Sequence, residues 1–116
     1  MSSVSWGRRD RYKFVSCGVL SSWLPPTVPA VFAITYKQDP QKRPKSHTVL
    51  YFGESEDLSQ QVSWINQKVM DFWKESGGTA DDLYVFVHAM SGSTKYERSR
   101  VQERLIAEYQ PHVNNN

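Results

Sequence analysis

Five apolar residues recur along one stretch of the chain at spacings of four, three, four and three: Leu58, Val62, Ile65, Val69 and Phe72. An α-helix with one buried face places its apolar side chains at this interval. The spacing therefore predicts a helix of about five turns that packs against a core. The glycine pair at 77–78 would end it, since glycine readily takes the left-handed conformation found at helix C-termini.

Three short segments around this helix are rich in β-branched and aromatic residues, as strands are: 31–36, 48–52 and 83–90. A second helix is expected over residues 95–109, because Val101, Leu105 and Tyr109 fall on one stripe and Pro111 ends it. The predicted order is β-β-α-β-α, which is an α+β fold with a small three-stranded antiparallel sheet. Residues 12–20 would add an edge strand or an ordered arm.

The composition describes one small globular domain. The 116 residues are 39% hydrophobic and 13% aromatic, enough for one core. No apolar run approaches the roughly 18 residues of a membrane span, and the basic N-terminus lacks the apolar run of a signal peptide. The single cysteine, Cys17, cannot form an internal disulfide. We therefore expect an intracellular protein, cytoplasmic or nuclear, that does not bind membranes.

Charge is divided unevenly along the chain. The net charge is only +2, but residues 1–45 carry eight basic and two acidic side chains, whereas residues 46–116 carry six and ten. The segment between the first two predicted strands holds four of the cations: Lys37, Lys42, Arg43 and Lys45. These residues could bind phosphates, act as a nuclear address, or simply solvate a loop.

Several separated motifs point to one family. They are Leu24-Pro25 followed by residues 29–34, then Tyr51-Phe52-Gly53 followed by residues 54–58, and finally Leu105-Ile106 with Pro111 and Asn114. In order and spacing they resemble the GIY-YIG nuclease superfamily, whose small domain has a three-stranded antiparallel sheet flanked by helices. The resemblance spans residues 24–114, with residues 1–23 as an N-terminal arm or edge strand and residues 115–116 as a frayed tail.

The positions that carry chemistry in this family are mostly replaced here. The resemblance implies a tyrosine that acts on the attacking water, an arginine that stabilises phosphate and a glutamate that holds a divalent metal. Phe32, Gln61 and Gln102 fall at these positions. They offer neither an ionisable oxygen, a fixed cation nor an anionic metal ligand. Tyr51 and Asn114 remain, so we interpret the five as a vestigial site and expect no catalytic residue.

Three functions follow as alternatives. The first is a non-catalytic module that binds DNA or RNA through its basic residues. The second is a protein-interaction or scaffold domain. Trp64 and Trp73 project from opposite sides of the first helix, so they cannot both lie in the core, and an exposed tryptophan could mark a partner surface. The third is an active, divergent Mg²⁺-dependent structure-specific nuclease that uses Tyr51 and, if the alignment shifts by one residue, Glu103. No cofactor is expected unless the domain is active, because His47, His88 and His112 lack metal-binding spacing. The oligomeric state is left open.

Overall fold

The computed structural model describes residues 3–20, 22, 24–25, 27–37, 47–60 and 62–114. Strands β1 (Ser3–Trp6), β2 (Tyr12–Val19), β3 (Ala30–Lys37), β4 (His47–Ser55) and β5 (Leu83–Ala89) form the sheet. Helices α1 (Val62–Glu75) and α2 (Lys95–Tyr109) flank it, and short 3₁₀ turns lie at Leu58–Gln60 and Ala80–Asp82.

The sheet has five strands in the order β1-β2-β5-β3-β4, and every neighbouring pair is antiparallel. The α+β class is therefore confirmed, whereas the expected three-stranded sheet is wrong by two strands. Residues 12–20 were expected at an edge or in an arm, yet β2 lies inside the sheet between β1 and β5. Apolar and polar residues do not alternate regularly along β2, and the pairing of β2 with β5 shifts in register between Ser16 and Val19.

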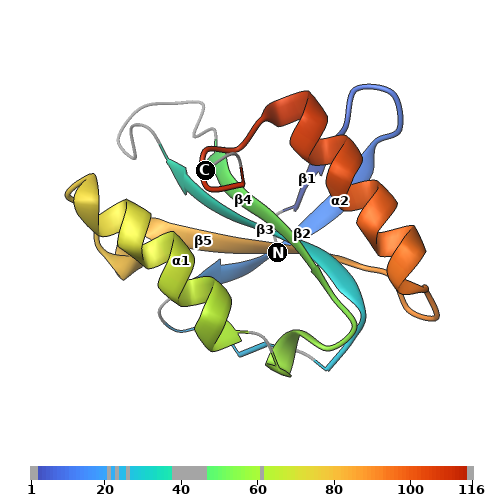
Figure 1. Cartoon of the computed structure of the whole chain (residues 1–116), viewed down its shortest axis with the longest axis horizontal. Helices are drawn as coiled ribbons and strands as arrows, with labels where there is room; N and C mark the ends of the chain where they lie inside the picture. Colours follow the sequence, from blue (N-terminus) through green and yellow to red (C-terminus); the bar gives the residue numbers. More distant parts are fainter. Residues whose placement is uncertain are drawn as a thin grey trace.

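The two helices cover opposite faces of the sheet (Figure 1). Successive side chains of a strand point to opposite faces of the sheet, so β3 contributes side chains to two cores. Phe32 and Ile34 pack in a cluster with Val69 of α1. Val31 and Ala33 pack in a second cluster with residues of α2.

The second core depends on the N-terminal strands. Trp6 of β1 lies edge-on to three phenylalanine rings, with centroids 5.0 Å from Phe14, 5.8 Å from Phe52 and 5.4 Å from Phe86. Such edge-to-face contacts stabilise a core beyond the area they bury. The N-terminal strands therefore belong to the same packed unit as the rest of the sheet.

The first helix is shorter than its apolar spacing suggests. Leu58 is buried, but it belongs to a 3₁₀ turn, and α1 begins only at Val62. The second helix has the predicted bounds. Its end is marked by Gln110 in the left-handed conformation, with φ of 47°, directly before Pro111. Among the described helices, none combines the length and hydropathy needed to cross a bilayer.

Candidate functional site

The candidate site is built around the second half of β4, which is an edge strand of the sheet. Phe32 of β3 pairs in register with Gly53 of β4. The Phe32 and Tyr51 rings lie on the same face of the sheet as α1, with centroids 5.9 Å apart. Gly53 is needed here, because a Cβ at this position would lie only 2.3 Å from the Phe32 ring.

The environment of Tyr51 favours the neutral, protonated form of its side chain. The residue is only 9% exposed, and burial, with a smaller contribution from the charge of Glu54, raises the pKa of its hydroxyl above the ordinary value of 10.0. Its proton is therefore held at neutral pH, so the group can donate a hydrogen bond but is a poor base. The ammonium group of Lys68, an exposed residue of α1, lies 5.9 Å from the centre of the ring.

The side chains of Gln102 and Asn114 meet at the backbone of one residue of β4, Phe52. The Asn114 side chain accepts a hydrogen bond from the Phe52 amide at 2.7 Å and donates one to the Phe52 carbonyl at 2.9 Å. Gln102 of α2 donates to the same carbonyl at 3.0 Å. The Val113 amide donates to the Leu50 carbonyl at 3.0 Å. Residues 113–114 therefore provide hydrogen-bond partners for backbone groups of Leu50 and Phe52 on the outer edge of β4.

The side-chain amides of Gln102 and Asn114 do not fit a divalent cation. A hard metal ion requires anionic or carbonyl oxygens, and Gln102 instead presents its NH₂ group to a carbonyl. Glu103 is exposed, about 100° further round the helix. Nowhere in the described ranges do three His, Cys, Asp or Glu side chains gather as metal ligands would.

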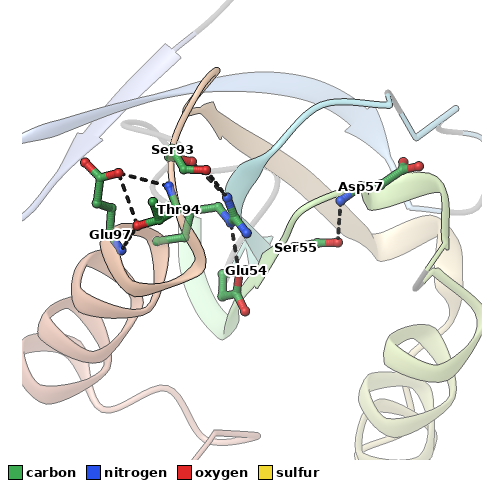
Figure 2. Close-up of polar contacts among 7 residues, drawn as sticks. Glu54, Ser55, Asp57, Ser93, Thr94 and Glu97 are labelled. Atoms are coloured by element: carbon green, nitrogen blue, oxygen red, sulfur yellow. Dashed lines mark hydrogen bonds and ion pairs between the residues drawn. The ribbon is translucent and has the colours of Figure 1, made fainter.

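A buried ion pair beside the site was not predicted from the sequence. Arg98 of α2 is 3% exposed, and its Nε donates to Glu54, the residue after Gly53, at 3.1 Å. Its Nη1 donates to the carbonyl of Ser93 at 2.8 Å and to its hydroxyl at 3.0 Å. These bonds join the end of β4 to the start of α2 (Figure 2). The available signal was that Arg98 lies one helical turn before Gln102.

The start of α2 is fixed by a capping box. The Thr94 hydroxyl accepts from the Glu97 amide, and the Glu97 carboxylate accepts from the Thr94 amide (Figure 2). The Thr94 bonds hold the pKa of Glu97 below its ordinary value. Ser55 likewise accepts from the Asp57 amide at 3.0 Å and orders the turn after β4. The backbone on both sides of the ion pair is therefore well defined.

The remaining predicted residues are placed only in part. Gln61, Lys42, Arg43 and Lys45 lie outside the described residues. Lys37 and Trp64 lie in β3 and α1, but their side chains are likewise outside the description.

Trp73 is half-buried on α1. Its indole N–H donates to the Thr79 carbonyl at 2.8 Å, and its ring lies 5.0 Å from that of Tyr36. Two further arginines of α2 are engaged elsewhere: Arg104 pairs with Asp10, and Arg100 lies 5.8 Å from the centre of the Tyr96 ring.

No protein-family model matches the sequence, and no curated protein matches it. Among solved structures, the chain is similar to the GIY-YIG N-terminal endonuclease domain of UvrC from Thermotoga maritima, in two point mutants bound to the catalytic divalent cation. The identities are 24% and 23%, and each TM-score is 0.47. Each match covers 78% of this chain and 87% of the other. The matched domain belongs to the superfamily that the motifs resemble, but likeness at this level carries nothing about activity.

Proposed function

We propose that this domain binds nucleic acid without cleaving it. The observation that carries the proposal is that the uncharged side chains of Gln102 and Asn114 hold the backbone N–H and C=O of Phe52. At the position where the sequence resemblance implies a metal-binding glutamate, the side chain is committed to holding an edge strand. Phe32 removes the first hydroxyl, and the raised pKa of Tyr51 keeps the second protonated. The replacements at Phe32 and Gln102 and the protonated state of Tyr51 all oppose catalysis and leave the surface available for binding.

Cations near this surface would supply the affinity. Lys68 lies over Tyr51, where it can contact a phosphate oxygen while the phenol donates a hydrogen bond. The sequence adds Lys37 at the end of β3 and Lys42, Arg43 and Lys45 between β3 and β4. Phosphate contacts of this kind give binding that is strong at low salt and weak at high salt.

The direct test is a gel assay with labelled single-stranded, duplex and branched DNA and RNA, each with and without Mg²⁺. We expect a shift that needs no Mg²⁺, weakens as salt is added and is accompanied by no cleavage. Mg²⁺-dependent cleavage that disappears in Glu103→Gln would instead make the domain an enzyme. If nothing shifts, the protein-interaction alternative takes precedence and a partner search follows.

Two lysines of α1 provide a matched pair of variants. Lys68 and Lys74 are both exposed, but Lys68 lies over the Tyr51 ring, whereas Lys74 is in the last turn of α1. We expect Lys68→Glu to weaken binding several-fold more than Lys74→Glu, since only Lys68 contacts the proposed phosphate position. Equal effects of the two variants would place the nucleic acid elsewhere. Charge reversal of Lys42, Arg43 and Lys45 should also weaken binding.

A further inference from the structure

A second feature lies further along β4, on the side where β4 begins. A hollow of about 360 Å³ opens between the ends of β3 and α1, the start of β4 and the chain after α2. Five ring-bearing side chains line it: Tyr36, Phe72, Trp73, Tyr109 and His112. None of the described residues that line this hollow is acidic.

The rings are arranged as two preformed pairs. The Tyr36 and Trp73 rings are tilted by 39° with centroids 5.0 Å apart. The Phe72 and His112 rings are stacked at 4.2 Å with an angle of 29°. The pairs offer two aromatic walls, and Thr48, Ser76 and Gln110 supply polar groups at the lining.

Trp73 is held in place before any ligand arrives. Its N–H donates to the Thr79 carbonyl, and the chain passes so close beneath the ring that a Cβ at Gly78 would lie 2.1 Å from it. A fixed ring loses little conformational entropy when a ligand stacks on it, so the hollow is suited to binding a flat group.

The sequence of the segment that joins β3 to β4 favours a ligand that is also anionic. β3 and β4, whose ends line the hollow, are joined by a segment that carries Lys42, Arg43 and Lys45 against one acidic residue, Asp39. A nucleotide has both features that this ligand would need: a planar aromatic base and a negatively charged phosphate. Aromatic stacking platforms beside cations are the usual means of binding single-stranded nucleic acid.

We propose that this hollow accepts an unstacked base of a single-stranded nucleic acid. The inference rests on the proposed function and adds the form of nucleic acid recognised. Bases in a duplex are stacked on one another and cannot enter, whereas a single strand can splay one base out. Thr48, which lines the hollow, and Tyr51, which lies under Lys68, are three residues apart on β4, roughly 10 Å at the usual rise per residue, so one nucleic-acid strand can reach both the hollow and Lys68.

The test compares two single strands of about 12 nucleotides, an oligothymidylate and an abasic strand of the same length and charge. We expect the intact protein to bind the oligothymidylate about tenfold more tightly, since stacking of one base is worth that much. His112→Ala should reduce the preference several-fold, because it removes one stacking wall. Tyr96→Ala is the control: Tyr96 is 69% exposed at the other end of α2 and should leave the preference unchanged.

A second readout separates stacking from a loss of folding. The oligothymidylate should quench Trp73 fluorescence more strongly than the abasic strand does, and Trp73→Phe should remove that difference. Circular dichroism of each variant checks that the fold is kept, and Phe72→Leu provides an independent change to the same wall.

The outcomes distinguish this inference from the proposed function. Equal affinity for the two strands, or a preference unchanged in both His112→Ala and Phe72→Leu, would overturn the base site while leaving phosphate-mediated binding intact. Binding of duplex alone would do the same. If no nucleic acid binds at all, both proposals fail.

Discussion

At the scale of single residues, the side-chain amides of Gln102 and Asn114 decide what the candidate site can hold. Three hydrogen bonds join these two side chains to the backbone of Phe52: two are donated to its carbonyl and one is accepted from its amide. A net contribution of about 1 kcal/mol for each bond is typical, and leaving a buried partner unsatisfied costs more. The amides therefore have a sufficient structural reason to occupy these positions, independent of any chemistry.

The variant Gln102→Glu tests this role. At neutral pH a carboxylate would face the Phe52 carbonyl with no proton to donate, so we expect the free energy of unfolding to fall by about 1–3 kcal/mol. Urea unfolding measures the change. Glu103→Gln, at the neighbouring exposed position, should shift it by less than about 0.5 kcal/mol. A Gln102→Glu protein that Mg²⁺ stabilises would instead indicate that this position faces a metal site.

Tyr51 gives a prediction about pH. Burial, followed by the charge of Glu54, raises the pKa of its hydroxyl above 10.0 in the folded state. The unfolded chain therefore loses this proton first as pH rises. The contribution to stability should be constant below pH 10 and should decline as pH rises towards the folded pKa. Ultraviolet titration of tyrosinate in the protein and in Tyr51→Phe would detect the group, and a pKa near neutrality would reopen the possibility of a general base.

At the scale of elements, periodicity located both helices and three of the five strands. It worked for α2 because Thr94 and Pro111 mark the ends of that helix in the sequence itself. It overextended α1, because Leu58 continues the apolar spacing while belonging to a separate 3₁₀ turn. The position of β2 inside the sheet depends on pairing with β5, a contact between distant segments that local patterns do not encode.

The sequence likewise predicted some residues of the candidate site and missed others. Motif spacing placed Phe32, Tyr51, Gln102 and Asn114 in one set; in the structure Phe32 contacts Tyr51, while Gln102 and Asn114 bind the backbone of Phe52. The ion pair of Arg98 with Glu54 was missed, because these residues are 44 positions apart and no local pattern connects them. Only the packing of α2 against β4 makes them neighbours.

This ion pair should be the strongest polar link between the two elements. Glu54→Ala would leave the Arg98 side chain buried with Ser93 as its remaining hydrogen-bond partner among the described residues, and we expect a loss of about 3 kcal/mol in the free energy of unfolding. Arg104→Ala breaks a pair whose side chains are 33% and 57% exposed, so it should cost no more than about 1 kcal/mol.

A double-mutant cycle refines the test. Because Glu54→Ala/Arg98→Met removes both charges, the double variant should be less destabilised than the sum of the two single changes. Additive losses would mean that the two side chains are energetically independent despite their 3.1 Å contact.

At the scale of the whole molecule, one sheet serves two cores, and both must form for β4 to be held. The core under α1 supports Phe32 and Tyr51, while the core under α2 supports Phe52, the residue that Gln102 and Asn114 bind. Because the adjacent β4 residues Tyr51 and Phe52 belong to different cores, neither core can be lost without disturbing the candidate site. The domain should therefore unfold as one cooperative unit.

Trp6 tests this coupling from the far edge of the sheet. Trp6→Ala removes the ring that contacts Phe14, Phe52 and Phe86, and truncations of this kind cost about 3–5 kcal/mol. A domain of this size has a total stability of about 5–15 kcal/mol, so the variant should be close to unfolding. Its urea transition, followed by circular dichroism and by tryptophan fluorescence, should move to lower urea and coincide for both probes. Leu24→Ala, at a residue 91% exposed, is the control that should not move it. Separate transitions for the two probes would show that β1 and β2 melt independently, and the N-terminal strands would then be an appendage rather than part of the unit that positions β4.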